Sequence, residues 1–119
     1  HALGAQVDGA PVASQFVDIA VFSFHAVKII TTGEGGMAVT QDAELAERMR
    51  LLHSHGITRD PARMQAEPRA GYYYEQLALG YNYRMTDIQA ALGLSQLARL
   101  AHMQAERVNL ADRYDDLLR

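Results

Sequence analysis

The sequence contains no cysteine and no long apolar run, and Lys28 is its only lysine. The absence of cysteine excludes disulfides, thiolate metal sites and a cysteine nucleophile, but it leaves the redox compartment undetermined. No apolar run approaches the roughly 20 residues that cross a bilayer, and no signal-type region opens the chain. We therefore expect no membrane partner and take a cytoplasmic location as the default.

An excess of positive charge is absent as well. A net charge of −3 and a pI near 5.9 provide no basic field for a phosphate backbone, so nucleic acid is not an expected partner. The 119 residues are 49% hydrophobic and 21% charged, as in one ordinary globular domain. The chain lacks an initial methionine and stops in a helical pattern at Leu117 and Leu118. We therefore expect residues 1–119 to be a single partial domain, truncated at both ends.

Short apolar runs in the first half predict two strands. They cover Ile19 to Phe24 and Met37 to Thr40, and a glycine-rich turn with Gly33, Gly35 and Gly36 separates them. By themselves these glycines are best explained as a hairpin turn. Further on, Asp42 is an N-cap candidate, and the apolar residues after it recur at helical spacing as far as Leu52.

A long loop is predicted from Thr58 to Gln76, where the periodicity disappears and Pro61 and Pro68 intervene. Such a loop is either a lid or subunit contact, or a surface segment without function. Its tyrosines could stack on a sugar or uracil ring or pack against a partner subunit. They are Tyr72, Tyr73 and Tyr74.

Two helices are predicted after this loop. Thr86 and Gln89 have the spacing of a capping box, and a further helix follows around His102. Both helices carry an apolar face. The apolar residues are Ile88, Ala91, Leu92, Leu94 and Leu97 in the first helix, and Leu110, Ala111, Tyr114, Leu117 and Leu118 in the second.

Lys28 stands among the apolar residues Val27, Ile29 and Ile30 rather than on a polar helix face. Because burial disfavours the ammonium form of a lysine, such a position suits a neutral amine that forms an imine. The alternative is a lysine at a strand end whose ammonium reaches solvent. Ser23 and the glycine turn, five residues to either side, supply a hydroxyl and backbone N–H groups of the kind that bind a phosphate.

Three stretches of the chain resemble one known family. Residues 22–36 read FSFHAVKIITTGEGG, residues 1–5 read HALGA, and residues 80–91 read GYNYRMTDIQAA. The first resembles the cofactor-lysine signature of the DegT/DnrJ/EryC1/StrS family of sugar aminotransferases, which depend on pyridoxal 5'-phosphate (PLP), and the other two resemble the same family in the same order. The resemblance implies an α/β fold, as a fragment of the fold type I (aspartate aminotransferase-like) large domain with its mostly parallel sheet.

The resemblance also assigns roles to residues. Lys28 would carry PLP as a Schiff base and transfer the proton, and Ser23 would bind the cofactor phosphate. Asn82 would reach the phosphate of the neighbouring subunit's cofactor, and Arg84 would support that contact, so the resemblance implies a homodimer with shared active sites. His1 matches a polar position beside the pyridine ring. The aspartate that pairs with the ring nitrogen would precede residue 1, so the fragment alone is expected to be inactive.

The resemblance implies transfer of an amino group, with glutamate as the donor, to a nucleotide-linked 4-keto-6-deoxy sugar. The likeness is greatest to family members of pseudaminic acid biosynthesis. A function from another class, a non-catalytic helical module for dimerisation, stays open because of the apolar helices. A metal site at His53 and His55 is not expected, because residues two apart at a helix end point in different directions.

Overall fold

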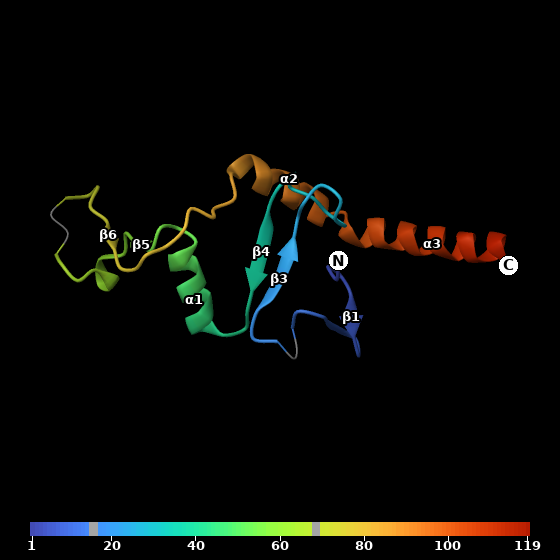
Figure 1. Cartoon of the computed structure of the whole chain (residues 1–119), viewed down its shortest axis with the longest axis horizontal. Coiled ribbons are helices and arrows are strands. Elements are labelled where there is room, and N and C mark those ends of the chain that lie inside the picture. The colour runs from blue at the N-terminus through green and yellow to red at the C-terminus, as the bar shows by residue number, and fades with distance from the viewer. Residues whose placement is uncertain (15–16, 68–69) are drawn as a thin grey trace. The chain divides into compact units, whose positions relative to one another are not determined.

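The computed structural model describes residues 1–14, 17–67 and 70–119 (Figure 1). The contacts within the chain divide it into two compact units. Unit 1 consists of His1–Val39 and Met85–Arg119, and unit 2 consists of Thr40–Arg84. Pro68, which we used to predict the long loop, lies outside the described residues.

The two predicted strands form a hairpin in unit 1. Strand β3 (Ala20–Ser23) pairs antiparallel with β4 (Gly36–Val39), with Ser23 opposite Gly36. The predicted apolar runs are therefore confirmed as strands. Gly36 is required at this pair, because a Cβ there would lie 2.8 Å from the backbone oxygen of Phe22.

A second hairpin in unit 1 joins β1 (Gln6–Val7) to β2 (Ala10–Pro11). Its two-residue turn is Asp8-Gly9, with φ of 50° and 79°. Positive φ at both central residues matches the twist of the flanking strands, and Asp-Gly is a preferred sequence for such turns. This hairpin was not predicted from the sequence, although Asp8-Gly9 is a local signal for it.

Two helices complete unit 1. Helix α2 (Asp87–Leu97) begins with the predicted capping box: Thr86 accepts from the backbone of Gln89, whose side chain accepts in return. Helix α3 (Leu100–Leu118) follows without a side-chain cap. The predicted apolar faces are exposed, with Ile88 85% and Leu118 82% accessible.

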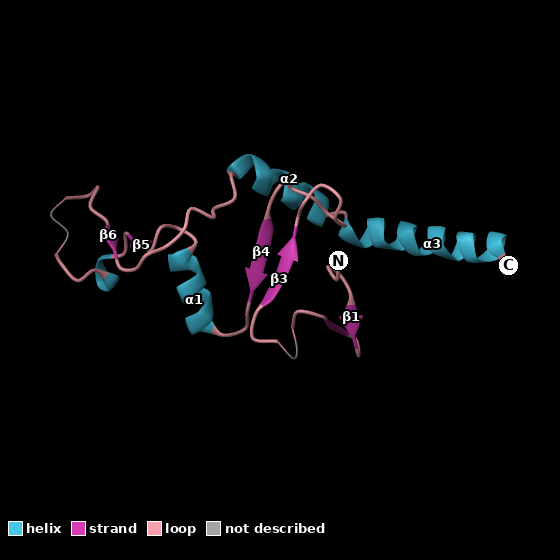
Figure 2. Ribbon diagram, viewed as in Figure 1, coloured by secondary structure: helices cyan, strands magenta, loops and turns pink. Residues whose placement is uncertain are grey.

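Unit 2 begins with helix α1 (Ala43–Leu52). Asp42 caps it as predicted, and its carboxylate accepts the N–H groups of Glu44 and Leu45. Short elements follow in the region predicted as a loop: β5 (Ile57–Thr58), the 3-10 helix η1 (Pro61–Arg63) and β6 (Glu75–Gln76), which pairs with β5 (Figure 2). The loop prediction missed them because two- and three-residue elements leave no periodicity.

The three strand pairs of the described residues are antiparallel, and their one parallel pairing is an isolated bridge between His25 and Gly33. The mostly parallel sheet was expected of a whole large domain, and it stays a prediction. The hydrophobic core is small. Among the described residues, Phe24 and Ile30 are the buried hydrophobic side chains, at 8% and 3% exposure.

Gly56 fixes the path of the chain after α1. Its φ is 68°, and a Cβ on it would collide with the backbone oxygen of Ala78. We expect Gly56→Ala to lower the free energy of unfolding by about 2–4 kcal/mol, from the left-handed backbone and the collision together. Urea unfolding of the full-length protein measures this change. Gly71→Ala is the matched control, because nothing lies within 4 Å of a Cβ at Gly71, and it should change stability by no more than about 1 kcal/mol.

Candidate functional site

Lys28 lies in the loop that connects β3 to β4, residues 24–35, which we call the lysine loop. Its backbone N–H donates to the carbonyl of His25 at 3.0 Å, which closes a turn. The apolar residues around Lys28 are therefore not part of a strand: β3 ends at Ser23, and Val27, Ile29 and Ile30 lie in the loop that follows it. The side chain is half-buried, as expected.

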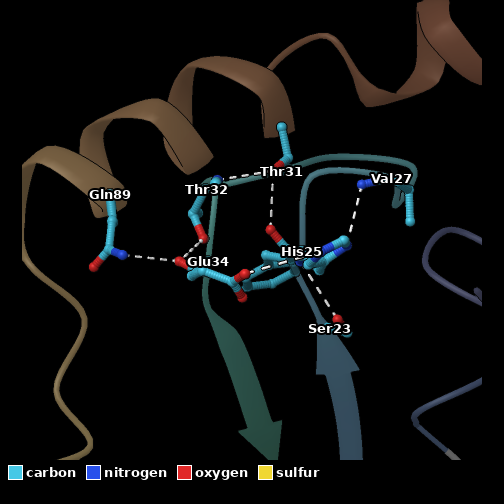
Figure 3. A network of polar contacts seen from close by, with 9 residues as sticks. Ser23, His25, Val27, Thr31, Thr32, Glu34 and Gln89 are labelled. Atoms are coloured by element: carbon cyan, nitrogen blue, oxygen red, sulfur yellow. Dashed lines mark hydrogen bonds and ion pairs between the residues drawn. The ribbon is translucent and has the colours of Figure 1, made fainter.

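The loop is held together by its two threonines (Figure 3). The hydroxyl of Thr31 donates to the carbonyl of Phe24 at 3.0 Å and accepts the N–H of Gly33 at 2.8 Å. The hydroxyl of Thr32, a residue only 4% exposed, donates to the carbonyl of Glu34 at 2.7 Å. These bonds provide partners for backbone groups that are not paired in a β-ladder, so they stabilise the conformation of the loop.

Side chains from α2 and α3 fasten the loop from outside. Gln96 Oε1 accepts the N–H of Thr31 at 2.9 Å, and Gln89 Nε2 donates to the carbonyl of Glu34 at 3.0 Å. Arg107 adds a longer bond to the carbonyl of Ile29 at 3.4 Å. This role of the three residues was not predicted from the sequence. Gln89 was visible only as a capping-box partner, and nothing local marks the other two.

Gly93 lets α2 approach the loop closely. A Cβ at this position would lie 2.9 Å from the Cγ2 of Thr32, which is shorter than an ordinary van der Waals contact. The helix therefore packs directly against the buried threonine at the end of the lysine loop.

His1 and Lys28 are brought together: Lys28 Nζ lies 3.0 Å from His1 Nε2. An ammonium can only donate, so with a charged lysine this contact requires a histidine that is unprotonated at Nε2. No ion pair of Lys28 is found among the described residues. Its amine thus contacts the imidazole of His1 rather than a carboxylate in this part of the chain.

Ser23, the predicted phosphate ligand, ends β3 and is exposed. Its Oγ accepts the N–H of His25 at 3.4 Å, a long bond that leaves the hydroxyl proton free to donate. His25 Nε2 lies 3.8 Å from the carboxylate of Glu34, so these two side chains face each other across the loop (Figure 3).

These residues fit a phosphorylated aldehyde cofactor. The lysine amine is half-buried and has no acidic partner in the described part of the chain, and a serine hydroxyl stands at the end of the adjoining strand. Lys28 and Ser23 are the residues that would hold such a cofactor, with His1 beside the amine.

Asn82 and Arg84 belong to unit 2. Asn82 is exposed and pairs through its backbone with Ser54 in an isolated antiparallel bridge. Arg84 Nη1 donates to the hydroxyl of Ser54 at 2.9 Å, and its Nη2 lies 3.5 Å from His55 Nε2. The rings of Tyr81 and Tyr83 stack at 4.8 Å, on either side of Asn82 in the sequence. The segment is therefore ordered by contacts within its own unit.

Both histidines that we weighed as metal ligands have other partners. His53 Nδ1 contacts the carbonyl of Arg50 at 2.7 Å, and His55 Nε2 faces Arg84. No group of three His, Cys, Asp or Glu residues that could hold a metal ion exists in the residues described. No helix in those ranges is both long enough and apolar enough to cross a membrane.

The sequence of the chain is similar to those of known aminotransferases. The model of the DegT/DnrJ/EryC1/StrS aminotransferase family matches residues 1–119. The chain is 40% identical over 115 residues to the UDP-4-amino-4,6-dideoxy-N-acetyl-beta-L-altrosamine transaminase of Campylobacter jejuni, covering 97% of the chain and 28% of that protein. It is 42% identical over 118 residues to the UDP-4-amino-4-deoxy-L-arabinose--oxoglutarate aminotransferase of Shewanella sediminis, covering 99% and 30%.

Solved structures agree with these matches. Helicobacter pylori PseC, an aminotransferase of pseudoaminic acid biosynthesis, superposes with a TM-score of 0.87 at 39% identity, over 100% of this chain and 29% of that one. A structure described as a sugar aminotransferase, Spr1654 from Streptococcus pneumoniae in its PMP-form, gives a TM-score of 0.83 at 40% identity, over 98% and 30%. The expected fold class, an α/β fragment of the fold type I large domain, is confirmed. The chain spans about 30% of the length of these relatives.

Gln96 tests how the lysine loop is fastened. We expect Gln96→Ala to lower the free energy of unfolding by about 1–3 kcal/mol, because the part-buried N–H of Thr31 loses its acceptor. Hydrogen exchange of the Thr31 amide should become faster. The exposed neighbour Ser95 supplies the control: Ser95→Ala changes the same helix without touching the loop, and its Thr31 exchange should equal that of the wild type. Equal protection of Thr31 in all three proteins would contradict the assigned role of Gln96.

Proposed function

The chain belongs to the DegT/DnrJ/EryC1/StrS aminotransferase family, and we propose that it forms the middle to C-terminal part of the PLP-binding large domain of a sugar aminotransferase. PLP is the cofactor of this family, and Spr1654 has been solved in both PLP- and PMP-forms. The observation that carries the proposal is the placement of Lys28, the only lysine, half-buried in a loop that two helices fasten.

Lys28 is the proposed catalytic residue. Its amine would hold the cofactor covalently and, once released, would move a proton between the reacting carbon atoms. When bound, the cofactor would supply an electron sink for the carbon that loses this proton. The loop's hydrogen bonds fix the direction of the lysine stem, so the amine stays in place during this exchange.

His1 and Ser23 are proposed cofactor-binding residues. The 3.0 Å contact between His1 Nε2 and Lys28 Nζ supports a role for His1 beside the cofactor ring. The free hydroxyl proton of Ser23 suits a phosphate oxygen, because hydrogen bonds to a charged acceptor are stronger than those to a neutral one.

Asn82 and Arg84 are proposed to act across a homodimer interface, on the cofactor phosphate of the neighbouring subunit. The exposure of both side chains supports this proposal, since a residue that serves a neighbour must be accessible on its own subunit. The chain alone is proposed to be inactive, because the partner of the ring nitrogen would lie outside it.

The substrate is proposed to be a nucleotide-linked 4-keto-6-deoxy sugar, with glutamate as amino donor, in aminosugar biosynthesis of the pseudaminic acid type. The names of the Campylobacter and Helicobacter relatives support this assignment. A cytoplasmic location stays a prediction.

A second function is compatible with one observation. The apolar faces of α2 and α3 are exposed, as in a helical module that dimerises without catalysis. The two functions differ in whether Lys28 is modified.

The first test is the visible spectrum of the full-length protein with PLP. We expect a yellow protein whose imine absorption disappears with borohydride, and a reduced cofactor attached to Lys28 in the peptide map. Lys28→Ala should abolish both signals and transamination. A colourless protein that still self-associates would support the helical module instead.

Shared active sites predict complementation between two inactive variants. In a mixture of Lys28→Ala and Asn82→Ala subunits, heterodimers contain one site with both residues intact. Random exchange of subunits should therefore restore up to about a quarter of the wild-type activity, because about half of the dimers are mixed and each has one complete site. Activity is measured after subunit exchange at denaturant concentrations that dissociate the dimer. If each subunit used its own Asn82, mixing would restore nothing.

A further inference from the structure

Helix α3 contacts two separate parts of the lysine site. Gln104 Nε2 donates to the carbonyl of Leu3 at 3.2 Å, close to His1 in the sequence. Arg107 Nη2 donates to the carbonyl of Ile29, in the lysine loop, at 3.4 Å. Residues three apart lie on the same side of a helix, so one surface of α3 contacts both segments. The roles proposed above do not include Gln104.

The carbonyl that Gln104 binds belongs to a turn. The N–H of Ala5 donates to the carbonyl of Ala2 at 3.0 Å, which closes the turn, and Gly4 has a φ of 80°, as the third residue of a type II turn requires. The Leu3 carbonyl lies in the middle peptide of this turn, and its bond to Gln104 is part-buried. Removal of the donor would leave a part-buried carbonyl without this partner, which costs more than an average hydrogen bond contributes.

Gly4 allows the amide group of Gln104 to lie directly against this turn. A Cβ at Gly4 would collide with the Nε2 and Cδ atoms of Gln104, and the positive φ at this position also favours glycine. The fit between the glycine and the glutamine is an observation independent of the hydrogen bond to Leu3. Both observations indicate that Gln104 fastens the turn to α3.

The fastened turn directly follows His1, whose Nε2 lies 3.0 Å from Lys28 Nζ. A lysine amine on its flexible four-carbon stem takes many directions, and an acceptor at a fixed place restricts them. We propose that Gln104 is a positioning residue of the lysine site, which holds the turn so that the His1 imidazole stays against the Lys28 amine. Gln104 acts through His1 and does not touch the amine itself. The consequence for attachment of the cofactor rests on the proposed function.

The rate at which PLP attaches to Lys28 of the full-length apoprotein, followed by visible absorbance, tests the proposal. Gln104→Ala removes the donor, and Gln104→Glu removes it while the side chain keeps its length, because an ionised carboxylate only accepts. We expect both variants to slow attachment about three- to ten-fold, the equivalent of one net hydrogen bond. Asn109→Ala is the matched control, because Asn109 is an exposed amide of the same helix, and its attachment rate should equal that of the wild type.

A double-mutant cycle separates positioning of His1 from a general effect on folding. If Gln104 acts through His1, Gln104→Ala should change the attachment rate by less than about two-fold in a His1→Ala background. A merely structural role would slow attachment equally in both backgrounds. Hydrogen exchange of the Ala5 amide, which closes the turn, should be faster in Gln104→Ala. Exchange of the Thr31 amide should equal that of the wild type, because Gln96 still accepts it.

Three results would overturn the proposal: equal attachment rates of Gln104→Ala and the wild type, an equal slowing with and without His1, or unchanged exchange of the Ala5 amide. Each of them refutes the role of Gln104 and leaves the aminotransferase intact, provided that borohydride fixes PLP on Lys28 of the wild type. Failure of the wild type to attach PLP refutes the aminotransferase instead. The exchange of the Ala5 amide then decides whether Gln104 holds the turn.

Discussion

The position of Lys28 depends on hydrogen bonds between the backbone of its loop and side chains that come from elsewhere. Loop residues 24–35 have no continuous strand ladder, so their N–H and C=O groups need other partners. Thr31 and Thr32 supply them within the loop, and Gln89 and Gln96 supply them from α2. Removal of such a partner leaves a polar group without compensation, and this cost is larger than the gain from an average hydrogen bond. The loop is thus held by these polar contacts together with the burial of Phe24 and Ile30, which are 8% and 3% exposed.

This arrangement explains why a glycine occurs in the middle of α2. Gly93 lowers the helix propensity of its segment, yet a side chain there would push against the methyl group of Thr32. Glycine makes helix formation less favourable at this position, but it allows α2 to contact the lysine loop closely. The capping box at Thr86 offsets part of that cost at the start of the same helix.

Features marked by neighbouring residues could be predicted from the sequence. The N-cap at Asp42, the capping box at Thr86 and the β3 strand all have local signals, and the structure confirms each of them. The partners of the lysine loop could not be predicted in this way, because Thr31 and Gln96 are 65 residues apart and neither has a distinctive neighbour. Lys28 was identified by its surroundings and by family resemblance, but its place in a turn followed only from the structure.

The exposed apolar helices and the small core have one common explanation. Two buried hydrophobic side chains in the described residues are far fewer than a domain of this length needs to offset the entropy of folding. The chain also spans only about 30% of its relatives. Both features agree with the proposal above that the chain forms only part of a large domain. Helix α2 combines this exposure with contacts to the lysine site. Gln89 and Gln96 bond the lysine loop, and apolar side chains of the same helix, such as Ile88 and Leu94, are exposed.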